Sequence, residues 1–294
     1  MFVEDLELEL TTICNAHCQL CYRNYKRYVP SKKVRPLQDI IDQLDTFKHL
    51  KYIKLVGTES EPTLYKDFFP LIKYIKSRGL EIEICTNGDT NNEDWWRELS
   101  TLMDSGDQVF FSICGSTQKL HNTYRKGTNL KNILRNAKAF RSDNKNDYAQ
   151  CIRFKYNSDD FDSKQFKDMV NQFSNVYWTE TYLKHDISNY IDIENIDLLG
   201  PREDKAKEYE NIEKLANLIS KSDMKKETHC MSWYNKSQQI DINGDVYPCF
   251  LYLESGMKWD GDYTDIHAQK HDICKWCNTT VRKISYEKGL QYVL

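Results

Sequence analysis

Hydrophobic and polar positions along the first two thirds of the chain change repeatedly between two periods. Residues 6–11 alternate apolar with polar side chains, which is typical of a half-buried strand. Residues 37–50 place apolar side chains three or four positions apart, as one face of a helix does. The same change recurs up to residue 181. It predicts strands at 6–11, 52–56, 80–86, 108–113, 149–154 and 176–181, and helices at 37–50, 67–78, 95–103, 130–140 and 163–173.

Strands that alternate with helices of this length favour parallel pairing, because a parallel pair needs a long connection and a helix supplies it. We therefore expect an α/β fold, either a sheet or an open barrel, over residues 1–200. In a barrel of this kind the functional side chains lie at the carboxyl ends of the strands.

The pattern changes after Gly200-Pro201. A polar helix is predicted at 202–220, and Asn243-Gly244 predicts the tight turn of a hairpin, because this pair adopts the positive φ angles that such a turn needs. The expected units are a domain at 1–200, a helical linker at 201–225 and a small cysteine-rich cap domain at 226–294.

Composition and charge exclude several classes of protein. With 40% hydrophobic and 13% aromatic residues among 294, the chain can build a folded core. Its 41 Lys and Arg against 44 Asp and Glu give a formal charge of -3, so no general basic field indicates nucleic acid. It begins with an acidic segment rather than a secretion signal and has no apolar run of about 18 residues. We therefore expect a cytoplasmic protein without a membrane span.

Ten cysteines fall into three groups. Without an export signal, metal binding, redox chemistry or burial accounts for them better than disulfides. Cys14, Cys18 and Cys21 form a C-x3-C-x2-C motif directly after the first predicted strand. A four-iron cluster normally takes four thiolates, so three leave one iron open to a substrate or cofactor. The others are Cys85, Cys114 and Cys151, which are single residues in apolar runs, and Cys230, Cys249, Cys274 and Cys277 in the last quarter.

A structural zinc site is the alternative interpretation of the first motif. Closed zinc sites are tetrahedral and take four ligands, and His17 within the motif would be the fourth. One short loop would then surround the ion without a second pair of ligands. Under this interpretation the protein is a zinc-stapled binding module and not an enzyme.

The motif CNAHCQLC at 14–21, after a strand and inside a six-fold βα pattern, resembles the radical S-adenosylmethionine (SAM) superfamily. Three further segments extend the resemblance. SEP at 60–62 stands where the family has GEP, TNG at 86–88 closes the third strand, and 111–127 resembles the fourth-strand segment, with Cys114 in place of the usual Asp. The resemblance implies a partial (β/α)6 TIM-like barrel in which a 4Fe-4S cluster and SAM generate a 5'-deoxyadenosyl radical.

By this resemblance Cys14, Cys18 and Cys21 hold the SAM-binding cluster and are the catalytic core. Ser112 and Arg125 are candidates to hold the methionine carboxylate, because a hydroxyl donor and a guanidinium fork both suit that group. The other candidate SAM contacts are Leu20 beside the adenine, Ser60, Glu61 and Pro62 in the segment that receives the methionine amino group, and Asn87 in the turn after the third strand.

The last cysteines resemble a shortened SPASM or twitch domain. Such a domain holds one auxiliary 4Fe-4S cluster, here through Cys230, Cys249, Cys274 and Cys277. The auxiliary cluster would accept an electron from a substrate radical, or would relay electrons and brace the cap. The leading hypothesis is therefore a dehydrogenase-like oxidoreductase that acts on a small or peptidic substrate. An electron donor such as flavodoxin or ferredoxin is the implied partner.

Two alternative classes of radical SAM enzyme stay open. Maturases of ribosomally made peptides often carry an N-terminal recognition domain, whereas the first strand here is predicted from Leu6. Enzymes that modify nucleotides or nucleic acids are suggested by residues 22–36, where six Lys or Arg and three Tyr occur without an acid. A solvated surface loop is the other interpretation of that segment.

The remaining candidates concern side chains near the strands. Cys85 and Cys151 are expected to be buried as small hydrophobic residues. Cys114 and Arg153 are candidate substrate contacts, because they lie near predicted strand ends. His185 and Asp186 follow the sixth predicted strand and are further candidates to line the same opening.

Overall fold

The structure is a computed structural model that describes residues 3–21, 23, 32–58, 60–141, 146–181, 196–199 and 237–247. Eight strands of this part form one sheet in the order β6-β5-β4-β3-β2-β1-β7-β8. Neighbouring strands from β6 to β7 are parallel, and β8 is antiparallel to β7. The strands are β1 (Asp5–Leu8), β2 (Tyr52–Leu55), β3 (Glu81–Thr86), β4 (Gln108–Ser112), β5 (Asn146–Arg153), β6 (Asn175–Glu180), β7 (Ser237–Ile240) and β8 (Val246–Tyr247).

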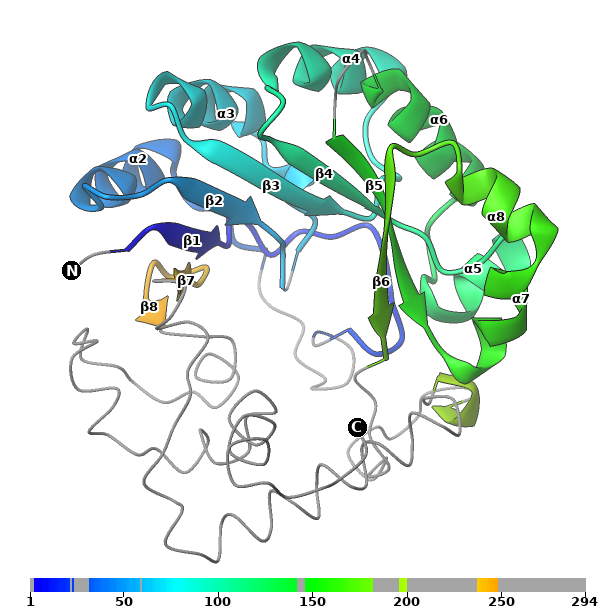
Figure 1. Cartoon of the computed structure of the whole chain (residues 1–294). Helices are drawn as coiled ribbons and strands as arrows, with labels where there is room; N and C mark the ends of the chain where they lie inside the picture. Colours follow the sequence, from blue (N-terminus) through cyan, green and yellow to red (C-terminus); the bar gives the residue numbers. More distant parts are fainter. Residues whose placement is uncertain are drawn as a thin grey trace, which may run out of the picture.

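Helices follow the strands and lie along the convex side of the curved sheet (Figure 1). Side chains of Asn92, Asn129 and Ser163 accept hydrogen bonds from backbone N–H groups in the first turns of three of them, which fixes where those helices begin. The helices are α2 (Leu37–Thr46), α3 (Phe68–Ser77), α4 (Glu93–Leu102), α5 (Gln118–Tyr124), α6 (Leu130–Phe140), α7 (Ser158–Asp162) and α8 (Lys164–Val170), with 3-10 turns η1 (Pro62–Leu64), η2 (Lys155–Asn157) and η3 (Ile196–Leu199).

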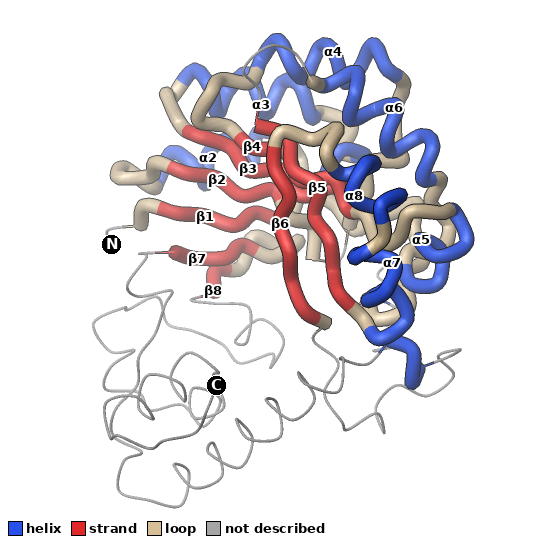
Figure 2. The backbone as a smooth tube through the Cα atoms, turned by 45° about the vertical axis from the view of Figure 1, so that its right-hand side comes forward, coloured by secondary structure: helices blue, strands red, loops and turns tan. Residues whose placement is uncertain are grey.

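The main core lies between the helices and the sheet. Alternate strand residues such as Leu6, Ile53 and Ile82 point into it and are completely buried. Residues of the opposite parity, such as Glu7 and Lys54, point to the other side of the sheet. We call that side the inner face; Figure 2 shows the strands that form it. The pleat of the strands thus separates an apolar face under the helices from a polar inner face.

The predicted α/β class and all six predicted strands are confirmed. The sequence analysis missed the short helices α5 and α7. It also gave no partner for the hairpin around Asn243-Gly244, whose first strand extends the same sheet by pairing with β1 from Asp5 to Leu8. The six-stranded pattern is therefore continued by two strands that come much later in the chain.

The hairpin turn is fastened to the segment that follows the cysteine motif. Gln43 of α2 donates a hydrogen bond of 2.8 Å to the carbonyl of Gly244 and accepts one of 2.6 Å from Arg35. Lys33 donates to the side chain of Asn243. Residues 33–35 consequently hold the turn of the hairpin against α2.

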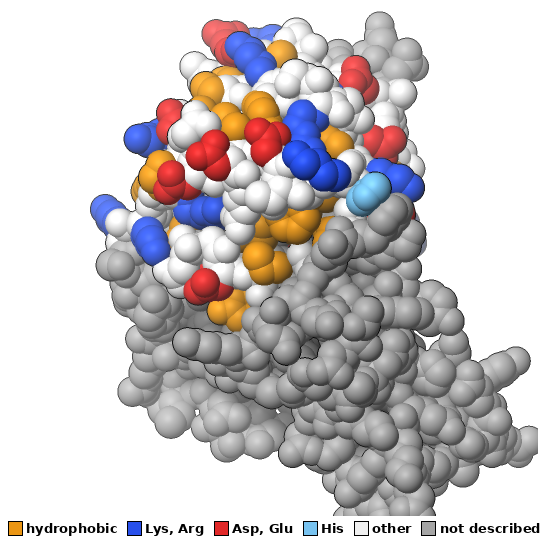
Figure 3. Space-filling model, turned by 90° about the vertical axis from the view of Figure 1, so that its left-hand side faces the viewer, with side chains coloured by type: hydrophobic (Ala, Val, Ile, Leu, Met, Phe, Trp, Pro, Cys, Tyr) orange, Lys and Arg blue, Asp and Glu red, His pale blue; other side chains and the backbone are white. Residues whose placement is uncertain are grey.

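The described part of the surface carries both signs of charge. On the side of the molecule that Figure 3 shows, acidic and basic side chains of the described residues are interspersed, and neither sign forms a patch. Among the described helices none is long and apolar enough to cross a membrane.

The two cysteines expected in the core differ in position. Cys151 is completely buried in the main core, as predicted. Cys85 is only half-buried, and its thiol lies 3.6 Å from a carboxylate oxygen of Glu83. Cys85 has the parity of Glu83 along β3 and therefore lies on the inner face, which corrects the expectation of simple burial.

A buried carboxylate connects the ends of α3, β3 and β4. The side chain of Asp107 is fully buried and accepts hydrogen bonds from the backbone N–H of Ile82 at 2.8 Å and from that of Asp104 at 2.6 Å. The ammonium of Lys76 lies 2.7 Å from the same carboxylate. Lys76 also pairs at 3.0 Å with Asp104, whose side chain is 76% exposed.

We expect Asp107→Ala to lower the free energy of unfolding by about 3 kcal/mol, because it leaves a partly buried ammonium and two backbone donors without their acceptor. Asp104→Ala is the matched control, since it removes the exposed partner of the same lysine and should cost less than about 1 kcal/mol. Urea unfolding of both variants measures the difference. Equal losses of unfolding free energy in the two variants would contradict the expectation that the buried carboxylate contributes more than the exposed one.

Candidate active site around three cysteines

The three cysteines of the first motif lie on one loop that follows β1. Cys14 and Cys21 are half-buried and Cys18 is buried. The backbone N–H of Ala16 donates to the sulfur of Cys14 at 3.4 Å, and the N–H of Cys21 closes a turn onto the carbonyl of Cys18 at 3.1 Å. The six cysteines of the described residues form no disulfide. Burial raises the pKa of Cys14 to about 12, so a metal that binds there must displace a proton.

Backbone hydrogen bonds fasten this loop to the segment after α5. The N–H of His17 donates to the carbonyl of Lys126 at 2.8 Å, and the N–H of Gln19 donates to that of Tyr124 at 3.1 Å. The side-chain amide of Gln19 also donates to the carbonyl of Thr123 at 3.0 Å. The end of α5 therefore sets the position of Cys18, which lies between the two anchored residues.

Glu61 joins three loops at the carboxyl ends of the strands. Its N–H donates to the carbonyl of Ile13 in the cysteine loop at 2.9 Å. Its carboxylate, 2% exposed, accepts from the hydroxyl of Thr86 at 2.6 Å, from the N–H of Asn87 at 2.7 Å and from the hydroxyl of Thr63 at 2.7 Å. The carboxylate is thus engaged inside the protein, and the structure gives Glu61 a positioning role.

Gly57 makes this approach of loops possible. It has a φ of +62°, and a Cβ atom there would lie 2.6 Å from the carbonyl oxygen of Ser60 and 2.9 Å from Cδ of Pro62. The hydroxyl of Ser60 donates to the carboxylate of Glu9. Pro62 is buried at the start of η1. The predicted SEP segment therefore packs directly beside the end of β1.

The other predicted SAM contacts surround the same loop. The side chain of Asn87 donates to that of Asn15 at 2.8 Å. Ser112 is 4% exposed at the end of β4, and its hydroxyl donates to Gln150 at 3.4 Å. Leu20 is half-buried and packs against a second apolar cluster, which is separate from the main core. The buried members of that cluster are Cys18, Cys114, Tyr124, Ile152, Phe154 and Leu199.

Arg125 lies within this second cluster. Its Nη1 donates toward the sulfur of Cys18 over 3.7 Å, and its guanidinium carbon lies 5.0 Å from the ring centre of Tyr124. Cys114, which is completely buried, also contacts the guanidinium. The Nε of Arg125 is buried without a hydrogen-bond partner in the structure. The cysteine loop, Arg125 and Cys114 therefore lie together in the structure.

His121 supports this arrangement without adding charge. It is completely buried, its Nδ1 accepts from the N–H of Cys114 at 3.3 Å, and its Nε2 lies 2.9 Å from the hydroxyl of Thr128. That hydroxyl donates to the carbonyl of Arg125 at 2.8 Å. Burial lowers the pKa of His121 to about 3, so the imidazole is neutral at physiological pH. Sequence reasoning missed this residue, and its place in the segment between Cys114 and Arg125 was the available signal.

The donor set fits an iron–sulfur cluster better than a single ion. Among the described residues no three His, Cys, Asp or Glu side chains gather closely enough to hold one metal ion. His17 is exposed whereas Cys18 is buried, which does not support a zinc site that uses both. A four-iron cluster assigns each cysteine to its own iron, so its ligands stand farther apart. The unpartnered Nε of Arg125 leaves a donor for an anionic group.

Arg153 does not lie in this site. It has the parity of Ala149 and Cys151, both core residues, and its guanidinium carbon lies 5.0 Å from the ring centre of Trp178 and 6.0 Å from that of Phe161. It therefore faces α7 on the helix side of the sheet, not the inner face that a substrate contact there would need. Unlike Arg153, several candidates lie outside the described residues. They are Cys230, Cys249, Cys274, Cys277, His185, Asp186 and most of the basic segment 22–36.

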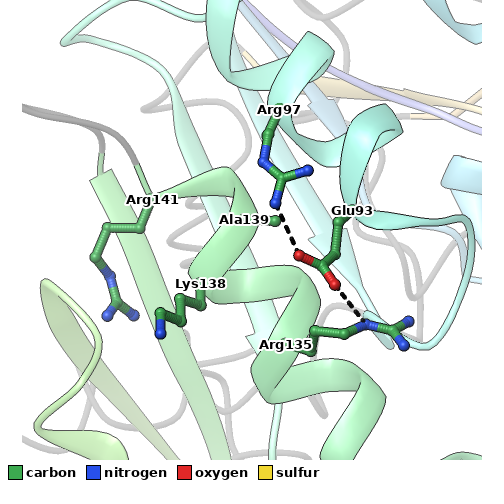
Figure 4. A pocket seen from close by; sticks show the side chains of 6 residues that line it. All are labelled: Glu93, Arg97, Arg135, Lys138, Ala139 and Arg141. Atoms are coloured by element: carbon green, nitrogen blue, oxygen red, sulfur yellow. Dashed lines mark hydrogen bonds and ion pairs between the residues drawn. The ribbon is translucent and has the colours of Figure 1, made fainter.

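A hollow between α4 and α6 lies on the convex side, and Figure 4 shows the four basic side chains and Glu93 that line it. Glu93 pairs with Arg97 at 2.8 Å and with Arg135 at 3.7 Å. Arg141 pairs with the buried carboxylate of Asp147 at 2.8 Å. Because the three arginines are paired and none of the predicted site residues lines the hollow, it is not a candidate active site.

A family comparison decides the nature of the cysteine loop. Residues 8–152, from the end of β1 to β5, match the family described as the radical SAM superfamily. This chain contains a radical SAM domain. The match includes the whole cysteine motif, Glu61 and Arg125, so the loops described above belong to that domain.

Individual proteins resemble parts of the radical SAM domain. A tungsten-containing aldehyde ferredoxin oxidoreductase cofactor-modifying protein of Pyrococcus furiosus is 31% identical over 109 residues, which are 37% of this chain and 30% of that protein. The mycofactocin maturase MftC of Mycobacterium ulcerans is 29% identical over 123 residues, 41% of this chain and 31% of that protein. The chain thus matches less than a third of the length of either relative.

The fold is similar to that of a solved structure with bound S-adenosylmethionine. The crystal structure of Streptococcus suis SuiB bound to S-adenosylmethionine has a TM-score of 0.65 and 16% sequence identity, and the match covers 97% of this chain and 74% of that one. At this identity the likeness concerns the fold.

The inner face of the radical SAM domain contains a carboxylate that is held in an unfavourable position. Glu7 of β1 accepts a hydrogen bond of 2.9 Å from Gln239 of β7. Burial is the largest influence on it and raises its pKa to about 7, which outweighs the opposing effects of Lys54 and Gln239. Above neutral pH the folded protein must therefore hold a charge in a poorly solvated place.

We expect Glu7→Gln to raise the free energy of unfolding at pH 8 by about 2 kcal/mol and to have little effect at pH 4. In the wild type the neutral acid is favoured in the folded state, so stability is lost as pH rises from about 4.5 through about 7. Glu4→Gln, at an exposed pair with Lys51, is the control and should show no such trend. Urea unfolding across this pH range tests it, and a pH-independent difference would contradict it.

Proposed function

We propose that this protein is a radical SAM enzyme that reductively cleaves SAM and abstracts a hydrogen atom from its substrate. The observation that carries the proposal is the packing of the Cys14, Cys18 and Cys21 loop against the half-buried guanidinium of Arg125. When bound, a reduced 4Fe-4S cluster supplies the electron that splits SAM into methionine and a 5'-deoxyadenosyl radical.

The residues of this chain would bind and orient the cofactors. The three cysteines hold the cluster, and Ser112 and Arg125 offer donors to the methionine carboxylate. Leu20 and the second apolar cluster, which includes Ile152 and Phe154, exclude water from the adenosyl side. Glu61 keeps the loops in register and is not itself required to touch SAM.

The first candidate for the overall reaction is oxidation that uses an auxiliary cluster. It is supported by the spacing of Cys230, Cys249, Cys274 and Cys277. With two clusters, a flavodoxin or ferredoxin would deliver the electron for SAM cleavage, and the auxiliary cluster would accept the electron left on the substrate. This assignment rests on the sequence.

The second candidate is the modification of a peptide. It is supported by the partial similarity to a mycofactocin maturase and by the likeness in fold to SuiB, which has also been solved bound to the precursor peptide SuiA with a TM-score of 0.65. The two candidates are compatible, because an auxiliary cluster can serve the oxidation of a peptide. Nucleotide substrates are the third candidate, supported by the basic segment 22–36 and by the partial similarity to a probable GTP 3',8-cyclase of Thermococcus kodakarensis, 27% identical over 92 residues.

Replacing Cys14, Cys18 and Cys21 together by Ala should abolish the formation of 5'-deoxyadenosine from SAM under reducing conditions, because no protein ligand of the cluster remains. Cys151→Ala, which removes a buried cysteine of the core, is the matched control and should retain the activity. Chromatography of the reaction products measures it. Continued formation of 5'-deoxyadenosine by the triple variant would overturn the proposed function.

Anaerobic reconstitution should give about eight iron and eight sulfide per chain, because two cysteine groups would each hold four of both. Replacing Cys230, Cys249, Cys274 and Cys277 by Ala should reduce both values to about four. Iron and acid-labile sulfide analysis, with zinc measured in parallel, provides the test. About four of each in the wild type would reject the auxiliary cluster and leave the SAM-binding cluster unaffected.

A further inference from the structure

Arg125 is a half-buried cation whose guanidinium contacts two cysteine sulfur atoms. Its Nη1 lies 3.7 Å from the sulfur of Cys18, and the thiol of Cys114 lies against the same guanidinium. No carboxylate of the described residues forms an ion pair with it. Tyr124, over whose ring it lies, and the rest of the second apolar cluster provide no counter-charge.

A half-buried cation with no counter-charge among the described residues is unfavourable, and the segment around α5 holds it firmly in place. His121 and Thr128 fix the backbone of Arg125, and the carbonyl of Tyr124 anchors the cysteine loop. The position of the guanidinium beside Cys18 is therefore determined from both sides. Removing Arg125 would not be compensated by another described cation in contact with that sulfur.

The charge of a thiolate-ligated cluster becomes more negative on reduction. A positive charge and an N–H donor next to a ligand sulfur stabilise the more negative state, so they raise the reduction potential. Exposed clusters use water for this purpose, whereas Cys18 is buried among apolar side chains. At such a buried sulfur, an N–H donor of the protein takes the place of water in stabilising the reduced cluster.

We propose that Arg125, besides any contact with SAM, raises the reduction potential of the cluster through its N–H contact with the sulfur of Cys18. Cys114 permits this, because a thiol accepts hydrogen bonds only weakly and does not draw the guanidinium away as a carboxylate would. This inference rests on the proposed function, since it requires a cluster on Cys14, Cys18 and Cys21. It concerns how readily the cluster accepts an electron, and not the binding of the methionine carboxylate of SAM.

The test is an EPR-monitored redox titration of the full chain without SAM, so that any role of Arg125 in binding SAM does not contribute. The signal of this cluster is the one that is lost in the Cys14, Cys18 and Cys21 triple variant. We expect Arg125→Gln to lower the equilibrium constant of reduction about tenfold, which is about 59 mV for one electron. Arg125→Lys keeps the charge but loses the planar fork and should give a smaller shift of the same sign.

Arg153→Gln is the matched control, because Arg153 is another arginine with a buried, unpartnered Nε but lies over Trp178, away from the cysteines. It should leave the potential unchanged. Cys114→Asp should lower the potential by giving Arg125 a carboxylate partner, whereas Cys114→Ser should leave it close to that of the wild type.

An unchanged potential in Arg125→Gln, with the wild type still forming 5'-deoxyadenosine, would overturn this inference and leave the proposed function standing. If Arg125→Gln does not retain iron, the titration of Arg125→Lys and Cys114→Asp decides, and two unshifted potentials reject the idea. A wild type that binds no iron at Cys14, Cys18 and Cys21 would instead reject the proposed function itself.

Discussion

The carboxylate of Glu61 is the interaction on which the geometry of the cysteine loop depends. A carboxylate that is 2% exposed is costly to bury unless donors surround it, and here Thr63, Thr86 and Asn87 supply them. Burial raises the pKa of Glu61 while these donors act in the opposite direction. Because the same residue donates its N–H to Ile13, the loops after β1, β2 and β3 meet at one buried group. A shift in any of them would leave a donor or the carboxylate unpaired.

The electrostatics of the site follow from a contrast between the buried His121 and the half-buried Arg125. His121 is kept neutral by burial, so it supports the backbone of Cys114 without a second positive charge. Arg125 stays charged because its guanidinium cannot be deprotonated at physiological pH, and it lies beside Cys18. The positive charge of Arg125 therefore lies beside the sulfur of Cys18. Its contribution to the potential felt by the cysteines is large, because the second apolar cluster excludes water.

The strands of the fold were predictable because each is a short apolar or alternating segment bounded by turn residues, as Ile82 and Ile84 before Asn87-Gly88 illustrate. The proximity of Cys18 and Arg125 in the structure was predictable because both belong to motifs of one family resemblance. The side of the sheet to which a side chain points was harder to predict. Side chains alternate along a strand, so Arg153 lies on the same side as buried Cys151, which is the helix side. Helix α5 escaped because its seven residues are mostly polar, and the pairing of β7 with β1 escaped because no local pattern encodes a partner so distant in sequence.

That distant pairing also changes what the cysteine loop is attached to. The N–H of Glu9 donates to the carbonyl of Ile240 at the end of β7, and the N–H of Thr12 donates to the carbonyl of Lys33 at 2.9 Å. Lys33 in turn holds Asn243 in the hairpin turn. The segments before and after the loop are therefore fixed to one hairpin, which joins them across the edge of the sheet. The bonds of Glu9 and Thr12 are backbone bonds, whereas Lys33 reaches the hairpin through its side chain. The start of the cysteine loop is therefore tied to β7 by the backbone, and the segment after the loop is tied to the hairpin turn by side chains.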